Sequence, residues 1–163
     1  MARTELDRNV QPSLLDRLID ESPLEAADAP KSHEESARLF RISVQRDVEL
    51  LLNTRRSIVP VDPMFSELRR SVHEFGLPDT TGVSPGTPEG RARLTDDVRD
   101  TILRFEPRLA NVVVRLGESD RIKTPQVRFV VSATLRMDPT PEQIVFDTVL
   151  DMSTGAVDVQ DKP

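Results

Sequence analysis

The sequence contains no cysteine, tryptophan or tyrosine, and among Phe, Trp and Tyr it has only six phenylalanines. Without cysteine the chain cannot form disulfides, use a thiol as a nucleophile or bind zinc through thiolates. Few aromatic side chains also leave little to stack on the bases of single-stranded nucleic acid. Lysine is scarce as well, with 3 residues against 19 arginines. Because arginine pairs with carboxylates through two parallel hydrogen bonds, this bias suits contacts between proteins.

Long apolar runs are missing too. No run approaches the roughly 20 residues that a membrane-spanning helix needs, and the N-terminal segment has no apolar core of the signal-peptide kind. We therefore expect a cytoplasmic protein that does not insert into a membrane. The formal net charge is −6 over 163 residues, which argues against broad electrostatic binding to nucleic acid. The length suits a single domain.

The hydrophobic pattern changes from a helical period to a strand period along the chain. Apolar spacings of three and four predict helices, and strict alternation predicts strands. We expect helices at 34–53, 64–75 and 91–105, and strands at 109–116, 127–137, 143–150 and, shorter, 156–159. Because the helices precede the strands, the expected class is α+β, with three N-terminal helices packed on a small antiparallel sheet of three to four strands.

A further short helix is predicted near the N-terminus. Ser13 is suited to cap it, and Leu14, Leu15 and Leu18 would form its apolar side. A helix this short is marginal in water, so it must dock either on its own domain or on a partner, and both interpretations stay open. The expected organisation is a docking helix and linker over 1–33, one α+β domain over 34–159 and a tail over 160–163.

The most specific local feature is the segment FEPRL at 105–109. Pro107 disfavours helical backbone at the residue before it, so the helix that precedes it should end there. In the extended chain that follows, alternation directs the side chains of Glu106 and Arg108 to the same side. The two residues then form either a local charge pair or helix cap, or a docking point for another chain.

No cluster of catalytic or metal-binding residues is evident. The two histidines, His33 and His73, are far apart in the sequence and have no obvious partner. A solvated or capping role is the simpler interpretation for both. We expect no catalytic residue, no metal and no cofactor.

The FEPRL segment resembles the Glu-Pro-Arg motif of the baseplate wedge family of contractile-tailed phages and type VI secretion systems. Three further segments, in matching order, resemble the secretion-system branch, the TssE family: PSLLDRL at 12–18, SVQRDVELLLNTRR at 43–56 and GLPD at 76–79. One departure is Phe75, where many relatives would have tyrosine. The resemblance implies a small α+β subunit of a cytosolic baseplate.

The resemblance also implies partners. The subunit would lie beside TssF and TssG, with TssK further out, and would template the first ring of the TssB–TssC sheath by strand exchange, in which a strand of one chain extends the sheet of another. We expect the strand 127–137 and its hairpin mate to offer the sheet edge, with Arg128 and Arg136 blunting it in the free subunit. The expected partner-binding residues are Glu106, Pro107, Arg108, Leu14, Leu15, Leu18, Arg128 and Arg136.

Two other functions are weighed against a non-enzymatic assembly subunit. A lysozyme-like glycan hydrolase needs two carboxylates around one bond, and Glu106 is the only strong candidate for the acid. Its neighbour Arg108 would hold this carboxylate ionised, which is the wrong state for a general acid. The other alternative is a stand-alone regulatory binding protein of the same fold. We favour the assembly subunit.

Overall fold

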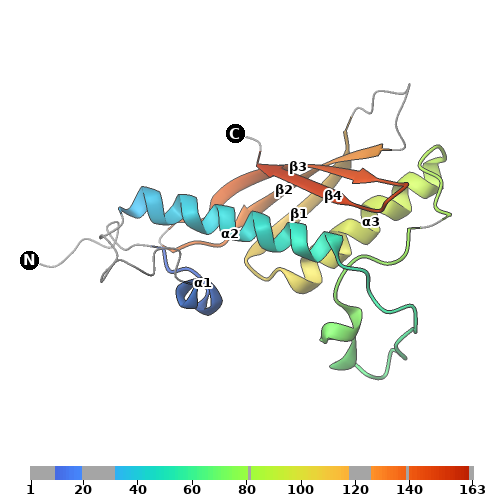
Figure 1. Ribbon diagram of the computed structural model, residues 1–163, viewed down its shortest axis with the longest axis horizontal. Helices are drawn as coiled ribbons and strands as arrows, with labels where there is room; N and C mark the ends of the chain where they lie inside the picture. Colours follow the sequence, from blue (N-terminus) through green and yellow to red (C-terminus); the bar gives the residue numbers. More distant parts are fainter. Residues whose placement is uncertain (1–9, 20–31, 81, 118–125, 139, 162–163) are drawn as a thin grey trace, which may run out of the picture.

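The computed structural model describes residues 10–19, 32–80, 82–117, 126–138 and 140–161. These ranges contain three α-helices, two single-turn 3-10 helices and four β-strands (Figure 1). The helices are α1 (Leu14–Leu18), α2 (His33–Asn53), η2 (Leu68–Arg70), η3 (Val72–Glu74) and α3 (Pro88–Phe105). The strands are β1 (Leu109–Leu116), β2 (Gln126–Leu135), β3 (Glu142–Asp151) and β4 (Val157–Asp161). Within the described ranges, no helix has the length and apolar character needed to cross a membrane.

The four strands form one antiparallel sheet in the order β1-β2-β3-β4. Every second side chain along β2 and β3 is buried, as the alternating sequence predicts. The long helices pack on this buried face, α2 against β4 and α3 against β1 (Figure 1). The predicted α+β class is confirmed. The helices are not all N-terminal, however, because α3 follows the two 3-10 turns in the middle of the chain.

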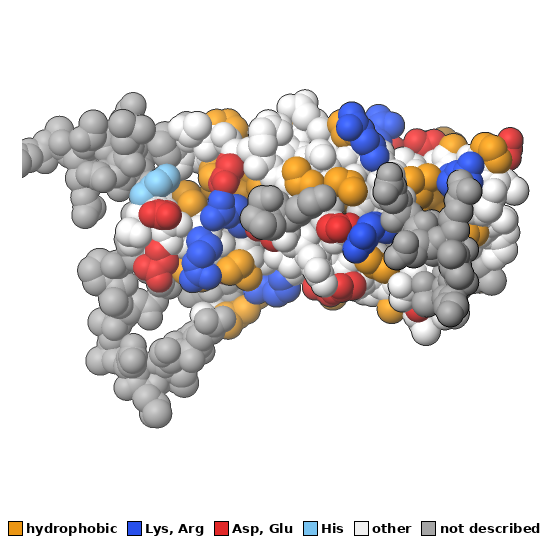
Figure 2. Space-filling view, turned by 90° about the horizontal axis from the view of Figure 1, so that it is seen from above, with side chains coloured by type: hydrophobic (Ala, Val, Ile, Leu, Met, Phe, Trp, Pro, Cys, Tyr) orange, Lys and Arg blue, Asp and Glu red, His pale blue; other side chains and the backbone are white. Residues whose placement is uncertain are grey.

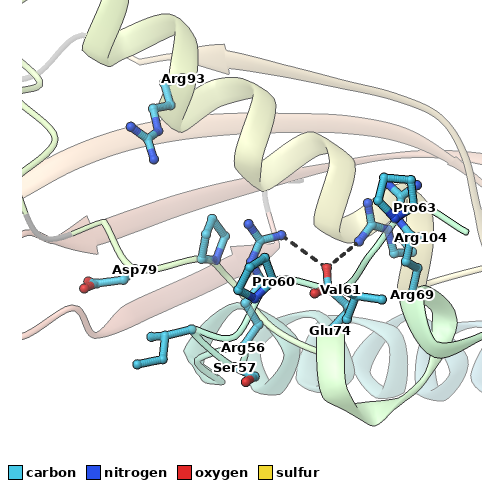
Figure 3. Close-up of a pocket in the computed structure, with 12 residues that line it drawn as sticks. Arg56, Ser57, Pro60, Val61, Pro63, Arg69, Glu74, Asp79, Arg93 and Arg104 are labelled. Carbon is cyan, nitrogen blue, oxygen red and sulfur yellow. Dashed lines mark hydrogen bonds and ion pairs between the residues drawn. The ribbon is translucent and has the colours of Figure 1, made fainter. Parts of the chain in front are cut away.

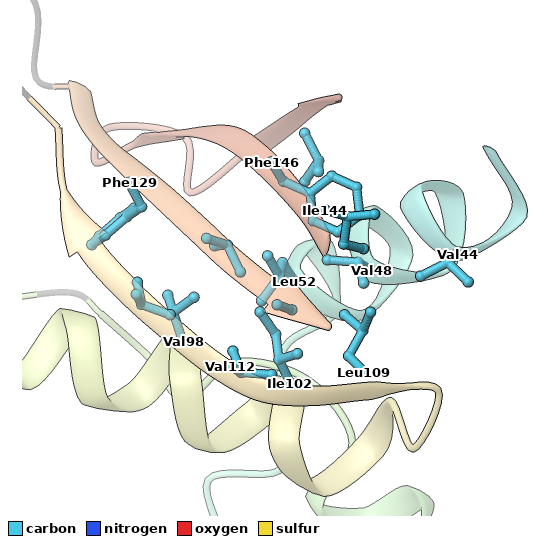
Figure 4. Close-up of a cluster of buried hydrophobic side chains, with 14 of the residues drawn as sticks. Val44, Val48, Leu52, Val98, Ile102, Leu109, Val112, Phe129, Ile144 and Phe146 are labelled. Atoms are coloured by element: carbon cyan, nitrogen blue, oxygen red, sulfur yellow. The ribbon is translucent and has the colours of Figure 1, made fainter. Parts of the chain in front are cut away.

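One core joins both helices to the sheet (Figure 4). Its central side chains include Val48 and Leu52 of α2, Ile102 of α3, Phe129 of β2 and Phe146 of β3. Each is buried, and burying one such side chain contributes about 1.5–3 kcal/mol to folding. Because the core is continuous, it fixes α2 and α3 relative to the sheet and holds the junction between α3 and β1 in place.

Hydroxyl groups determine where the two long helices begin. The Ser32 hydroxyl accepts the N–H of Glu35 at 3.2 Å, and the Thr87 hydroxyl accepts the N–H of Gly90 at 3.1 Å. Pro88 takes the first helical position of α3, where a backbone N–H is not needed. The helix therefore starts at Pro88 rather than at residue 91, because a Pro-Glu-Gly start resembles a loop in the sequence.

The predicted helix over 64–75 is wrong. The segment forms η2 and η3, and Phe65, Leu68 and Val72 of its expected buried face are exposed. Ser71 separates the two turns, since its backbone is extended with a ψ of 176° and its hydroxyl accepts the N–H two residues later. An apolar spacing of three and four does not make a helix where no other element covers the apolar face.

The expected sheet edge is also wrong. The segment 127–137 is β2, which pairs with β1 on one side and β3 on the other, and β3 in turn pairs with β4. The edges are therefore β1 and β4. Alternation reports which face a side chain takes but not which strands flank it, because central and edge strands have the same period.

The two arginines assigned to that edge lie elsewhere. Arg128 projects from the outer face of the sheet and forms an ion pair with Asp147 of β3 at 3.3 Å. Arg136 is exposed just beyond the end of β2. Acidic, basic and apolar side chains are intermingled on the face of the molecule seen in Figure 2. The outward positions of β2 and β3 include Arg128, Ser132 and Asp147, so the outer face of the sheet is a mixed surface.

The N-terminal segment contacts the domain ahead of α1. Val10 is buried in the core, and its N–H donates to the Ser36 hydroxyl of α2 at 3.1 Å. The predicted linker falls mostly on residues 20–31, which lie outside the described residues. The end of the predicted tail, 162–163, lies outside them as well.

Candidate functional site

The Glu-Pro-Arg segment lies where α3 ends and β1 begins. Glu106 closes α3 by donating its backbone N–H to the Ile102 carbonyl at 2.9 Å. Its two carboxylate oxygens accept hydrogen bonds from one guanidinium, with Nε of Arg108 2.7 Å from Oε1. The two side chains lie together as predicted, but through a turn and not through extended chain, because the N–H of Leu109 donates to the Glu106 carbonyl at 3.1 Å. The pair is not a solvent-exposed one, however, because Glu106 is only 4% exposed.

The same guanidinium reaches α2. Nη2 of Arg108 donates to Oδ2 of Asp47 at 2.7 Å, and the guanidinium lies 5.8 Å from the ring centre of Phe40. Hydrogen bonding to Glu106 raises the pKa of Arg108 above its usual value, burial opposes this, and Asp47 adds to the increase. Arg108 therefore braces the junction between α3 and β1 against α2.

Arg46 and Asp47 connect this pair to α1. Nη2 of Arg46 donates to Oδ1 of Asp47 at 3.0 Å and to Oδ1 of Asp16 at 2.6 Å. Asp16 also accepts the hydroxyls of Ser13 at 2.6 Å and Ser43 at 2.7 Å. Burial by itself would raise the pKa of Asp16, but the hydrogen bonds from Ser13, Arg46 and Ser43 outweigh it and lower that pKa well below its usual value. A charged, hydrogen-bonded contact thus attaches α1 to α2.

Three of the four motif segments meet in this one arrangement, which we call the motif network. Its members are Ser13, Asp16, Ser43, Arg46, Asp47, Glu106 and Arg108. The segments 12–18, 43–56 and 105–109 each contribute side chains to it. Sequence reasoning identified all three segments but missed the acidic member from α1 and the members from α2. The available signal was the presence of these polar residues inside the motif segments.

The apolar side of α1 faces away from the protein. Asp16 contacts α2, whereas Leu14, Leu15 and Leu18 are 77%, 65% and 81% exposed. The predicted helix and its Ser13 cap are both present. Within the described residues, α1 therefore contacts its own domain through its polar side, and its leucines form an exposed apolar patch.

The fourth motif segment, 76–79, fixes the chain at the end of α2. The N–H of Leu77 donates to the Thr54 carbonyl at 2.8 Å, and the N–H of Arg56 donates to the Leu77 carbonyl at 3.0 Å. Gly76 has a φ of +107°, and a Cβ atom there would lie 2.3 Å from the Thr54 carbonyl oxygen. Both the positive φ and the close approach require glycine at this position.

The geometry around Glu106 does not suit acid catalysis. Arg108 binds both of its oxygens, and a general acid must instead present a proton to the substrate. In the part of the chain that the structure describes, no three His, Cys, Asp or Glu side chains gather as a metal site. The ring of His73 lies 3.1 Å from the Val59 carbonyl oxygen through Nε2.

Comparison of the sequence with models of known protein families identifies its family. The family model described as baseplate wedge protein gp25 matches residues 38–140, which are 103 of the 163 residues. The chain belongs to the baseplate wedge protein gp25 family. This family has a structural role in baseplates and implies interaction with other baseplate components. The match includes both sides of the contact between Arg108 and Asp47. No curated protein matches the sequence.

Proposed function

We propose that this chain is the TssE-type subunit of a cytosolic type VI secretion baseplate and that it works without enzymatic activity. It joins the wedge formed with TssF and TssG, with TssK further out, and it initiates the TssB–TssC sheath. The observation that carries the proposal is the motif network, in which two segments that resemble the secretion-system branch, 12–18 and 43–56, contact the Glu-Pro-Arg segment of the wider family. Membership of the baseplate wedge family supports the broader structural role.

Strand addition is proposed at β1, since α2 covers the other edge of the sheet. The Asn53 side chain donates to the Val157 carbonyl at 2.7 Å and accepts the Val157 N–H at 2.9 Å. The Gln45 side chain donates to the Val159 carbonyl at 2.7 Å. A strand that paired with β4 would have to displace both amides.

The edge of β1 is open among the described residues. The N–H of Gly117 donates to the Arg128 carbonyl at 2.8 Å, which fixes the alternation of the ladder between β1 and β2. By that alternation Val114 and Leu116 direct their N–H groups away from β2. The regular edge begins after a bulge at Asn111, whose φ is +52°. Residues 113–116 therefore offer a short edge to a neighbouring strand.

The wedge contacts are proposed on the exposed side of the motif network and on the α1 leucines. The Arg46 side chain is 52% exposed, against 5% for Glu106. Because Glu106 is buried, its role in docking is to hold Arg108 in place, while Pro107 stands on the surface. The outward-facing Arg128 and Arg136 are proposed as further contacts.

The variant Leu116→Pro tests the strand-addition step. It removes one outward N–H and leaves the hydrogen bonds between β1 and β2 in place. We expect a normal melting temperature and normal co-purification with TssF and TssG, but no sheath assembly when TssB and TssC are added. The matched control, Leu116→Ala, keeps the N–H and should support assembly.

Two results would contradict the proposal at different levels. A folded Leu116→Pro variant that starts sheaths normally would exclude β1 as the acceptor edge. Failure of the unaltered chain to co-purify with TssF and TssG would contradict the baseplate role itself. A wall-digestion assay on the pure protein should show no activity, and a measurable activity lost in Glu106→Gln would support a hydrolase instead.

A further inference from the structure

A cleft of about 450 Å³ lies between residues 56–63 and α3, outside the motif network (Figure 3). Its charged lining residues are Arg56, Arg69, Arg93, Arg104, Glu74 and Asp79. Four arginines against two carboxylates make the lining basic, whereas the whole chain has a net charge of −6. The cleft is therefore a local exception to the charge of the protein.

Glu74 balances only part of this positive charge. It is buried and lies between Arg56, at 3.6 Å, and Arg104, at 3.2 Å, as the dashed lines of Figure 3 mark. Arg69 forms no ion pair with any residue that the structure describes, and Arg93 has only a 3.8 Å contact with a carboxylate on its own helix. Both of these side chains are exposed. They present guanidinium donors that an incoming anion can bind.

Apolar side chains are exposed along the same segment of the chain, 57–75. They are Ile58, Val59, Met64, Phe65, Leu68 and Val72, and the first and last of these are 88% and 86% exposed. Three prolines, Pro60, Pro63 and Pro78, also line the cleft. Because proline fixes its backbone φ, the wall they form is largely shaped before anything binds.

These features favour an acidic peptide over a nucleic acid. Guanidinium groups bind carboxylates and phosphates alike. The net charge of −6, however, opposes the approach of a long polyanion. Exposed apolar side chains beside the arginines match the apolar side chains of a peptide, which a phosphate backbone lacks.

We propose that this cleft binds an acidic segment of a neighbouring protein chain. Carboxylates of that segment pair with Arg69 and Arg93, and its apolar side chains pack on residues 57–75. The inference rests on the proposed function, because the neighbour is taken to be a baseplate subunit, and it names the chemistry of that contact. It also gives a role to the fourth motif segment, since Pro78 and Asp79 line the cleft.

A labelled peptide of alternating glutamate and leucine is a direct probe, with binding to the full chain followed by fluorescence anisotropy. We expect saturable binding that weakens with added salt. The double variant Arg69→Gln with Arg93→Gln should bind about tenfold or more weakly, equivalent to about 1.4 kcal/mol. The matched double variant Arg38→Gln with Arg99→Gln removes two exposed arginines elsewhere on α2 and α3. It should bind like the unaltered chain.

Three outcomes would overturn the inference: no saturable binding of the peptide, equal loss in both double variants, or preferential binding of a single-stranded oligothymidine. The last would assign the cleft to nucleic acid. Co-purification with TssF and TssG separates this test from that of the proposed function. If the unaltered chain co-purifies but does not bind the peptide, the cleft proposal fails and the baseplate proposal stands. If the chain binds the peptide at the cleft but does not co-purify, the baseplate proposal fails and peptide binding by the cleft stands.

Discussion

Arg108 donates a 2.7 Å hydrogen bond to Asp47, which precedes it by 61 positions, while it also binds both carboxylate oxygens of Glu106. One guanidinium thus ties the end of α3 and the start of β1 to the middle of α2. Glu106, the buried member of this arrangement, stabilises the fold of the chain and is not accessible to a partner. Arg46, whose side chain is 52% exposed, is the part that a partner can reach, and Asp47 beside it is half-buried.

Arg108→Ala should destabilise the protein by about 3–5 kcal/mol, because it leaves Glu106 as a buried carboxylate without its partner. Arg108→Lys should recover only part of this loss, since an ammonium group cannot donate two parallel hydrogen bonds. Denaturant unfolding measures both effects. The control is Arg115→Ala, an exposed residue of β1 for which we expect a change within about 0.5 kcal/mol. If Arg108→Ala is as stable as the unaltered chain, the pair does not brace the fold and serves docking alone.

The attachment of α1 should depend on pH through Asp16. Its pKa is lowered in the folded protein, so the carboxylate contributes stability above the unfolded value of about 4. That contribution is lost as the pH falls through the lower folded pKa. Asp16→Asn should loosen α1 already at neutral pH. Hydrogen exchange at residues 14–18 measures the effect, with core amides of β2 as the internal reference. Unchanged exchange of α1 in Asp16→Asn would show that the leucines or the preceding segment hold the helix.

The leucines of α1 should matter for assembly and not for folding. Leu15→Asp combined with Leu18→Asp should leave the melting temperature almost unchanged, because both side chains are exposed. The same variant should co-purify poorly with TssF and TssG. Leu50→Asp, at an exposed leucine of α2, is the matched control and should assemble normally. A large drop in melting temperature would place the α1 leucines in the core instead.

Gly76→Ala should destabilise the protein by about 1–3 kcal/mol, because alanine is strained at positive φ and its Cβ meets the Thr54 carbonyl. Gly82→Ala separates these two causes. Gly82 also has a positive φ, of +83°, but a Cβ there meets nothing within 4 Å. Thermal unfolding of both variants should therefore show the larger loss for Gly76→Ala. Equal losses would mean that the close approach to Thr54 adds nothing.

Features set by neighbouring residues were predictable from the sequence. The strand predicted from the run LANVVVRL at 109–116 has the observed bounds of β1, and Pro107 correctly marked the end of α3. Glu106 and Arg108 flank Pro107, so their pairing is local, although the chain between them forms a turn and not the extended segment that the sequence predicts. Each of these depends on the backbone period or on the chemistry of one proline.

Features set by distant residues were not predictable in this way. Nothing local to Asp16 shows that Arg46 will meet it, and nothing in the alternation of β2 shows that β1 and β3 flank it. The segment 64–75 has the apolar spacing of a helix but lacks an element to cover that face. In each case the deciding contact lies elsewhere in the sequence.

Asn53 and Gln45 cover the β4 edge, and this limits how further strands can extend the sheet. Among the described residues only the β1 edge of the sheet is free, so each copy can pair with only one further strand. Two copies that paired through their β1 edges would form a closed symmetric dimer, and no fibre would grow from it. Under the strand addition proposed above, such a chain would start a ladder that other proteins lengthen, yet it would not lengthen that ladder with copies of itself. Two amide side chains on one helix would then be enough to give an assembly a beginning and a direction.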